Sequence, residues 1–417
     1  MTRLTHRLRL PSVRKVALRS ALGFAGLQAS VVAGLVITDA LEKRRRVRRP
    51  GFPHPGTFDC DVAGNDVAVY TYGEDLYRDM LAAIEGGERQ ILFETFLWKD
   101  DDVGRAFRDA LNAAAARGVD VYVIHDGFGN LVVPPSFFRF HPAVKAFRFP
   151  PVKAHLLHAP LRAAGVTHRK LLVVDREIGF SGGFNIGSLY ATEWRDTHAR
   201  VTGPAVFELE HAFSQVWNHL AARHPELTPT DSAPWSSPLR MVCNVPADIA
   251  YPIRGLYLDA ISRARHHVQI TTPYFIPDQQ ILHALIEASR RGVAVQVMLP
   301  EESNHLLADW LSRGFYSTLL AEGIEVLLYR DAMIHAKTAT IDGQWSIVGT
   351  ANIDRLSLRV NYEADLEIRD PEFAAGMERV FAADSDNCRR LDRGEWGRRH
   401  PAARFAETVL VPLRPFL

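Results

Sequence analysis

Two short stretches of this chain repeat three reactive side chains at one spacing. In each stretch a lysine follows a histidine by two residues, and an aspartate follows the lysine by five. The six residues are His168, Lys170 and Asp175 in the first stretch and His335, Lys337 and Asp342 in the second. Both stretches are strand-like, and side chains two apart on a strand point to the same side. Each strand therefore presents an imidazole and an ammonium group together, whereas each aspartate, at a strand end, is either catalytic or structural.

Further polar residues follow each stretch at equal distances. Asn185 and Asn352 each lie 17 residues after a histidine, in a turn that begins with glycine. Asp196 and Glu363 follow the asparagines by eleven residues. A carboxylate of this kind can fix the tautomer of an imidazole, and an asparagine can donate an amide hydrogen. If the two copies meet, they form one site with two histidines, two lysines and two asparagines.

Such a site suits a phosphodiester substrate. Two ammonium groups and two amides can hold the non-bridging oxygens and stabilise the charge that builds on them in the transition state. One histidine can attack phosphorus, and the other can protonate the departing alkoxide and later deprotonate the incoming alcohol or water. We expect neither a metal nor another cofactor, because the lysines supply positive charge.

The repeated spacing extends to the architecture. From about residue 60 onward, strand-like apolar runs alternate with amphipathic helical stretches, which predicts an α/β fold. The offset of 167 residues holds for the histidines, lysines, aspartates and asparagines, which indicates an internal duplication of a whole domain. We expect two homologous α/β domains about a pseudo-two-fold, at 51–220 and 241–390, with a proline-rich linker at 221–240 and a tail at 391–417.

Residues 1–50 differ from the rest in charge. They carry 12 Lys or Arg against 2 Asp or Glu, whereas the remainder carries 37 basic against 46 acidic residues. The run Ser20–Thr38 is uncharged and largely apolar, and basic residues flank it on both sides. This pattern predicts a segment that associates with an anionic membrane surface, spanning the bilayer or lying in its cytoplasmic face. The alternative is an ordinary buried helix.

Composition excludes several classes of protein. With 47% hydrophobic and 23% charged residues, the chain is neither collagen-like nor disordered. Cys60, Cys243 and Cys388 are scattered, which predicts neither a disulfide framework nor a thiolate metal site and favours a reducing compartment. The acidic body argues against a long nucleic-acid groove.

The paired motifs resemble those of the phospholipase D superfamily, and their detail resembles the bacterial cardiolipin synthases of the B type. The segments that carry the likeness are HRKLLVVD at 168–175, GGFN at 182–185, TPYFIPD at 272–278, IHAK at 334–337 and GTANID at 349–354. Thr350 stands where the family commonly has serine and keeps the hydroxyl, so it joins Asn185 and Asn352 as an expected substrate-binding residue. The first copy has Gly183 at that position, so the two half-sites are not equivalent.

The resemblance implies a phosphatidyltransferase that condenses phosphatidylglycerol with a second phospholipid through a phosphatidyl-histidine. It makes His168 the nucleophile and His335 the general acid and base, with Asp196 and Glu363 each orienting a histidine of the opposite repeat. With the basic N-terminal segment, it also implies the cytoplasmic face of the inner membrane. The internal duplication means that one chain can supply the entire site, so no oligomer is required. The alternatives are a phospholipase D-type hydrolase, a nucleic-acid phosphodiesterase, which the acidic body disfavours, and a non-catalytic membrane scaffold, which the intact motifs disfavour.

Overall fold

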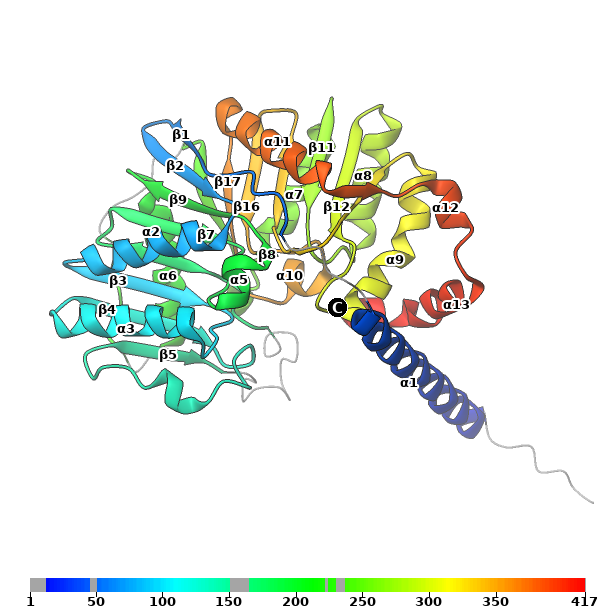
Figure 1. Cartoon of the computed structure of the whole chain (residues 1–417), viewed down its shortest axis with the longest axis horizontal. Helices are drawn as coiled ribbons and strands as arrows, with labels where there is room; N and C mark the ends of the chain where they lie inside the picture. Colours follow the sequence, from blue (N-terminus) through cyan, green and yellow to red (C-terminus); the bar gives the residue numbers. More distant parts are fainter. Residues whose placement is uncertain (1–12, 46–50, 151–164, 222–223, 230–236, 417) are drawn as a thin grey trace, which may run out of the picture.

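Two eight-stranded mixed sheets stand side by side in the computed structural model of this chain (Figure 1). The structure describes residues 13–45, 51–150, 165–221, 224–229 and 237–416. Part of the predicted linker, at 222–223 and 230–236, therefore lies outside the described residues. The predicted fold class, two homologous α/β domains preceded by an apolar helix, is confirmed.

The first sheet has the strand order β1-β2-β9-β7-β6-β3-β4-β5. Its strands are β1 Phe58–Val62, β2 Asn65–Tyr70, β3 Gln90–Thr95, β4 Asp120–Asp126, β5 Lys145–Phe149, β6 Leu171–Val174, β7 Ile178–Gly182 and β9 His198–Thr202. The helices of this half are α2 Gly73–Gly86, α3 Asp102–Ala116, η1 Pro135–Phe138, α5 Ser188–Thr192 and α6 Val206–Leu220. Strands β3, β4 and β5 run parallel, and the other neighbours pair antiparallel.

The second sheet repeats this plan in the order β10-β17-β16-β15-β11-β12-β13-β18. Its strands are β10 Leu239–Asn244, β11 His267–Thr271, β12 Ala294–Pro300, β13 Glu325–Tyr329, β15 Thr338–Ile341, β16 Trp345–Gly349, β17 Glu363–Ile368 and β18 Cys388–Arg390. Its helical elements are η2 Pro246–Asp248, α7 Pro252–Arg263, α8 Gln279–Arg290, α9 Leu306–Ala321, α10 Arg355–Arg359, α11 Pro371–Asp386, α12 Arg393–Gly397, α13 Pro401–Leu410 and η3 Val411–Phe416. Here β11, β12 and β13 are the parallel strands.

The duplication extends to single hydrogen bonds. The side chains of Asp101 and Asp278 cap the first turns of α3 and α8. At the other ends of these helices, Arg117 donates to the carbonyls that end α2, and Arg291 donates to the carbonyls that end α7. Gly118 and Gly292 follow with φ of 96° and 91°, a region that favours glycine. Both copies therefore use the same local chemistry to turn from helix into parallel strand.

The two halves are joined by backbone pairing at the centre of the molecule. Strand β8 (Trp194–Arg195) of the first half pairs in parallel with β14 (Met333–Ile334) of the second. A second crossing lies nearby, where Tyr362 accepts from the amide of His168 at 2.9 Å and donates to the carbonyl of Val166 at 3.0 Å. These crossings fix the register of the segments that carry the two histidines.

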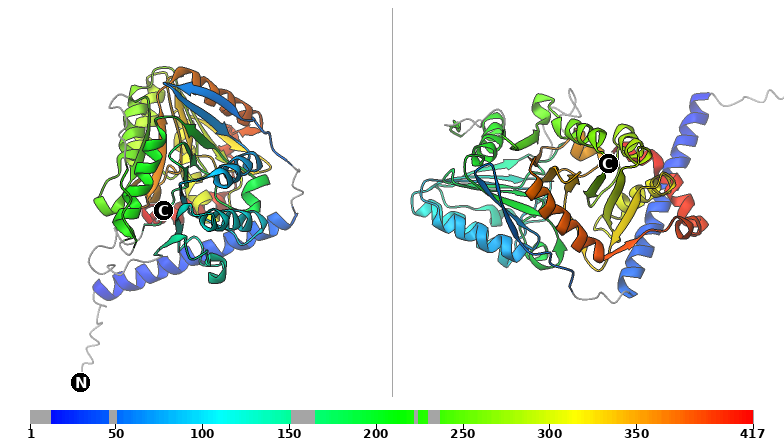
Figure 2. Two further views of the ribbon diagram at one scale, coloured as in Figure 1. Left: turned by 90° about the vertical axis from the view of Figure 1, so that its left-hand side faces the viewer. Right: turned by 90° about the horizontal axis from the view of Figure 1, so that it is seen from above.

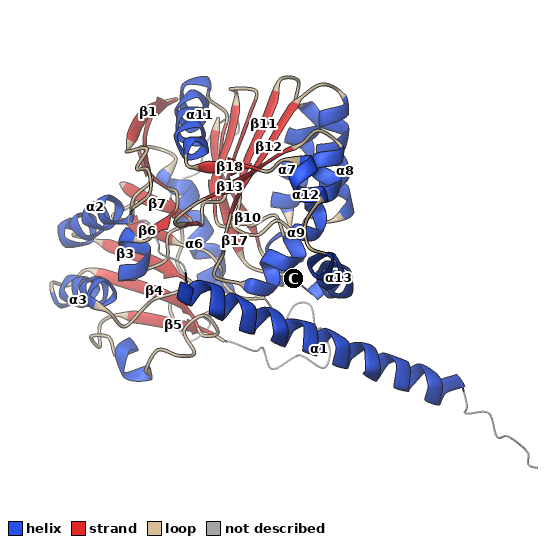
Figure 3. Ribbon diagram, turned by 45° about the vertical axis from the view of Figure 1, so that its right-hand side comes forward, coloured by secondary structure: helices blue, strands red, loops and turns tan. Residues whose placement is uncertain are grey.

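The N-terminal helix α1, Val13–Arg45, leaves the body at an angle (Figure 3). Within the described residues it is the one helix long and apolar enough to cross a membrane, over Ser20–Thr38, and this window is not buried. One side docks on the second half: Gln28 donates to the carbonyl of Val409 in α13 at 3.0 Å, and Val31, Val32 and Leu35 pack on the second domain's core. The basic side chains that flank the window lie outside the described part.

Candidate active site

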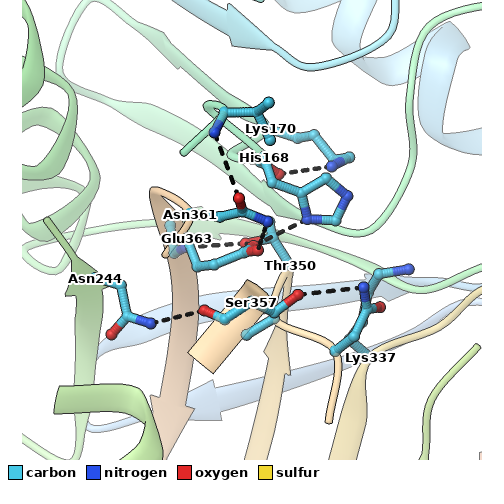
Figure 4. A network of polar contacts seen from close by, with 12 residues as sticks. His168, Lys170, Asn244, Lys337, Thr350, Ser357, Asn361 and Glu363 are labelled. Carbon is cyan, nitrogen blue, oxygen red and sulfur yellow. Dashed lines mark hydrogen bonds and ion pairs between the residues drawn. The ribbon is translucent and has the colours of Figure 1, made fainter. Parts of the chain in front are cut away.

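Three of the predicted residues, His168, Lys170 and Lys337, lie where the two halves abut (Figure 4), and their charges also act on His335. His168 precedes β6, and His335 follows β14 and precedes β15. All four side chains are buried, and the two histidines retain 8% and 5% exposure, more than Lys170 and Lys337. The pseudo-two-fold thus gathers residues 167 positions apart into one site.

Each histidine is hydrogen-bonded to the acid of the other half. The Nδ1 atom of His168 lies 2.9 Å from Oε2 of Glu363, and Nδ1 of His335 lies 2.6 Å from Oδ2 of Asp196. An ionised carboxylate only accepts hydrogen bonds, so each Nδ1 carries the proton. This tautomer leaves Nε2 of each imidazole with its lone pair available for chemistry.

Burial sets the charge state of these pairs. The pKa of His168 is lowered well below its usual value by desolvation and then by Lys170 and Lys337. Desolvation and the same two lysines also lower the pKa of His335. Burial raises the pKa of Asp196, and it raises that of Glu363 to about 7. The resting site therefore holds neutral imidazoles, the form a nucleophile requires.

Each lysine is hydrogen-bonded to the backbone carbonyl of the histidine two residues before it. The Nζ atom of Lys170 donates to the carbonyl of His168 at 2.6 Å, and Lys337 donates to the carbonyl of His335. Desolvation lowers the pKa of Lys170 to about 8 and that of Lys337 to about 7. A bound anion would oppose both shifts, because an opposite charge nearby favours the protonated ammonium.

The three expected substrate-binding residues play different parts. Asn185 accepts from the amide of Leu97 at 3.2 Å, and Asn352 donates to Ser357 at 3.3 Å while its Oδ1 is buried without a hydrogen-bond partner. The hydroxyl of Thr350 donates to Oε2 of Glu363 at 2.6 Å. Its only hydroxyl hydrogen is used there, so we propose that Thr350 positions Glu363, and its contact with substrate stays a prediction.

The two acids are supported differently, because the halves differ at this point. Thr350 sits beside Glu363, and Asn361 donates to Oε1 of Glu363 at 3.4 Å. In the first half the equivalent position is Gly183, where a Cβ would lie only 2.0 Å from Oδ1 of Asp196. That oxygen accepts the amide of Thr197 at 2.8 Å instead. A side-chain donor thus supports one acid, and a backbone donor supports the other.

The two motif aspartates lie at the far ends of the motif strands, and their contacts there favour the structural alternative over the predicted catalytic role. The carboxylate of Asp175 accepts the amides of Glu88, Arg89 and Gln90 at 2.7–2.8 Å, at the far end of β6. Asp342 does the same for residues 265–267 at 2.7–2.9 Å. Both have positive φ of 54° and end a strand. They tie the end of each motif strand to the start of its antiparallel neighbour, β3 or β11, and their carboxylates bind these amides rather than His168 or His335.

Two aromatic residues that contact the histidines do not belong to the repeated motifs, so the motif spacing did not predict them. The ring of Phe96 lies edge-on to His168 with centroids 4.9 Å apart, and the ring of Trp194 lies 5.0 Å from His335. Trp194 lies two residues before Asp196, at the start of β8, but Phe96 follows β3 and is far from either motif in sequence. Asp365, which accepts the amides of Thr350 and Ala351 at 2.8 and 3.0 Å, has a histidine as its counterpart in the first half.

Comparison with known proteins agrees with this geometry. Residues 80–217 and 257–385, one segment in each half, match the family model of the cardiolipin synthase, phospholipase D-like domain. The chain belongs to this cardiolipin synthase family. It is 33% identical over 368 residues to the major cardiolipin synthase ClsA of Bacillus subtilis (strain 168). The aligned region covers 85% of this chain and 76% of that protein. It is 30% identical over 370 residues to a cardiolipin synthase of Clostridium perfringens (strain SM101), and this alignment covers 85% of this chain and 77% of that protein.

A solved structure supports the fold of this family member. The crystal structure of a phosphatidylserine synthase from Haemophilus influenzae superposes with a TM-score of 0.63 at 14% identity, over 84% of this chain and 95% of that one. The predicted family resemblance is therefore confirmed. Two relatives, from Bacillus subtilis and Pseudomonas fluorescens, bear A-type names, so the similarity establishes the family rather than the B type.

Proposed function

We propose that this enzyme makes cardiolipin by transferring a phosphatidyl group from phosphatidylglycerol to the hydroxyl of a second phospholipid. The observation that carries the proposal is the crossed pair of hydrogen bonds, His168 to Glu363 and His335 to Asp196. It aligns two imidazoles beside two buried lysines, one for attack on phosphorus and one for proton transfer, as a two-step transfer requires.

In the first step, Nε2 of His168 attacks phosphorus, and the bond from phosphorus to the glycerol oxygen breaks. His335 gives its Nε2 proton to that oxygen, and glycerol leaves. The negative charge of the bound phosphodiester and of Asp196 favours the protonated form of His335 at this point. Lys170 and Lys337 stabilise the charge on the non-bridging oxygens.

In the second step, His335 removes the proton from the hydroxyl of the second phospholipid. The resulting oxygen attacks phosphorus, the bond between nitrogen and phosphorus breaks, and His168 is regenerated. Glu363 stabilises the positive charge that the imidazole of His168 carries while it is bonded to phosphorus. Water in place of the second lipid would yield phosphatidic acid, the hydrolase outcome.

We place the enzyme at the cytoplasmic face of the inner membrane, anchored by α1. The contact of Gln28 with Val409 supports an orientation along the membrane surface, because a spanning α1 would draw α13 into the bilayer. Helix α13 carries exposed Arg404 and the buried Glu407, which pairs with Arg399. One chain supplies both halves of the site, so no oligomer is required. We retain 51–220 and 241–390 as the domain boundaries.

The test is lipid analysis of the full chain purified in detergent, supplied with phosphatidylglycerol, with and without phosphatidylethanolamine. We expect cardiolipin by mass spectrometry from the wild type and none from His168→Ala. His211→Ala, which removes an exposed histidine of α6, serves as the matched control and should retain activity. Phosphatidic acid as the sole product would make the enzyme a hydrolase, and a cardiolipin yield unaffected by His168→Ala would refute the assignment of the nucleophile.

A further inference from the structure

The loop between β4 and η1, residues 127–133, carries three large apolar side chains in solvent. Phe128 is 56% exposed, Leu131 is 60% exposed and Val132 is 84% exposed. Single exposed apolar residues are common on soluble proteins, but three within five positions form a patch that indicates a binding partner.

The base of this loop is held by buried polar groups, so the exposure is built into the fold. Oδ1 of Asp126 accepts the amides of Phe128 at 2.8 Å and Gly129 at 2.7 Å. The side chain of Asn130 donates to the carbonyl of Phe96 at 2.7 Å and accepts the amide of Trp98 at 2.8 Å. Both Asp126 and Asn130 are at most 3% exposed.

The same base is directly joined to the catalytic histidine. Oδ2 of Asp126 accepts the amide of Thr167, the residue before His168, at 3.0 Å. The backbone of Gly129 lies against Phe96, because a Cβ there would be 2.8 Å from its ring. That ring lies edge-on to His168. The apolar loop is therefore the protein surface next to the nucleophile.

The second half has no apolar loop at the equivalent place. Strand β12 is followed by Glu301, Glu302, Ser303 and Asn304, a polar and acidic segment. The asymmetry argues against a role in the fold common to both halves. Of these two equivalent loops, the one on the His168 side is the apolar one.

The loop also lies on the side of the molecule that carries α1. The segment from β4 to η1 and the helix α1 both lie at the lower side of the body in Figures 1 and 3 and in the left view of Figure 2. Helix α1 exposes apolar side chains of its own there, including Leu22 at 64% and Ile37 at 60%.

We propose that the 127–133 loop inserts Phe128, Leu131 and Val132 into the acyl region of the lipid bilayer, beside the path by which a phospholipid reaches His168. The proposal rests on the phospholipid substrate of the proposed function. The occupant is the bilayer because the adjacent site acts on lipid headgroups and the nearby α1 is apolar on the same side. Since the loop base bonds to the residue before His168, insertion sets the depth of that histidine below the headgroups.

Insertion is measured directly with the full chain. Val132→Cys, labelled with a fluorophore, is reconstituted into vesicles of phosphatidylglycerol and phosphatidylcholine with bromine on the acyl chains, and labelled wild type provides the background of Cys60, Cys243 and Cys388. Ala382→Cys is the matched control, because this exposed residue of α11 lies on the opposite side from α1 (Figure 3). We expect brominated lipid to quench the Val132 probe and to leave the Ala382 probe unquenched.

Equal quenching at both positions, or none at Val132, would overturn the proposal. So would shielding of the Val132 probe in detergent that grows with protein concentration, because the patch would then bind a second copy of the chain.

A second measurement compares activity on vesicles with activity on detergent-dispersed lipid. Replacing Phe128, Leu131 and Val132 by serine should lower the vesicle-to-micelle activity ratio about tenfold, whereas Ala382→Ser should not change the ratio. An equal loss in both lipid forms would show a structural role and overturn the proposal. If the wild type makes no cardiolipin in micelles, the proposed function fails, and the quenching experiment still decides the insertion.

Discussion

Replacing Glu363 by glutamine and Asp196 by asparagine should damage the enzyme to different degrees, although both changes remove one carboxylate charge. Oε2 of Glu363 accepts both the Nδ1 proton of His168 and the hydroxyl of Thr350. A glutamine can place its carbonyl oxygen there and keep both bonds, with its amide nitrogen toward Asn361, whose contact is long at 3.4 Å. Glu363→Gln therefore keeps the tautomer and loses the charge.

Asp196→Asn cannot do the same. Oδ2 of Asp196 accepts from His335, and Oδ1 accepts the amide of Thr197 at 2.8 Å. An asparagine has one oxygen, so it either faces an amide with an amide or forces His335 into the opposite tautomer. The first choice strands a buried donor at a cost of about 1–3 kcal/mol, and the second moves the Nε2 lone pair to Nδ1.

The magnitudes follow from the bonds lost. A hydrogen bond to a charged group contributes about 1 kcal/mol more than a neutral one, and somewhat more in a dry site, so we expect Glu363→Gln to lower kcat about 10- to 100-fold. A wrong tautomer in a His–Asp pair costs about 10⁴ in the serine proteases, and we expect Asp196→Asn to lower kcat about 10³- to 10⁴-fold.

The assay is cardiolipin formation from phosphatidylglycerol, followed by mass spectrometry, with thermal unfolding to show that both variants fold. Glu363→Ala, which loses tautomer and charge together, should fall to the level of Asp196→Asn. If Glu363→Gln lowers kcat as much as Asp196→Asn does, then the two acids do not differ in whether a single amide oxygen can replace their hydrogen bonds, and the expected difference is refuted.

Four further results are expected. Lys337→Met should abolish activity yet stabilise the fold at pH 7 and below in thermal or urea unfolding, because burial penalises the Lys337 ammonium and lowers its pKa to about 7. Unfolded lysine binds its proton more tightly than buried Lys337, whose pKa is about 7. The wild-type unfolding free energy should therefore rise with pH from about 7 to 10, a slope that Lys337→Met must reduce. The pH profile of kcat/KM should be a narrow bell near pH 7, since Glu363 with a pKa of about 7 must be ionised, whereas Lys337 with a pKa of about 7 and Lys170 with a pKa of about 8 must be protonated; a flat profile from pH 6 to 9 would contradict these assignments. Asp175→Ala should lower stability by about 2–3 kcal/mol, because three backbone amides lose their acceptor, and should change kcat less than twofold; a well-folded but inactive variant would return Asp175 to the catalytic set. Chelation with EDTA should leave cardiolipin formation unchanged, and restoration of a lost activity by Mg²⁺ would show that the lysines do not supply all the positive charge.

The fold and the two histidine–lysine pairs could be predicted from the sequence because the duplication presents each motif twice at a constant offset. A histidine and lysine two apart on a strand must share a face, and a constant offset requires the two copies to be alike. The pairing of each histidine with the acid of the other half came from the family resemblance, and the structure shows the distances. Spacing alone says nothing of which half supplies which acid.

Other features depended on tertiary packing and could not be predicted. Asp175 belongs to the motif by spacing, but a strand of four residues separates it from the site and brings it against the amides that precede β3. Thr350 was expected at the substrate, and only the position of Glu363 shows where its hydroxyl hydrogen goes. Phe96 follows a different strand, and only the antiparallel pairing of β3 with β6 brings it to His168.

The crossed histidine–acid pairs have a consequence for how such a site can evolve. A single half could complete this arrangement only as a homodimer, in which symmetry would place the same residue on both sides of the axis. Fusion of two copies into one chain removes that constraint, so each side can mutate independently. Gly183 and Thr350 have diverged in this way, and so have the apolar loop after β4 and the acidic one after β12. With His168 as the proposed nucleophile and His335 as the proposed proton carrier, the surroundings of each histidine can be tuned separately, whereas in two identical subunits every change appears on both sides.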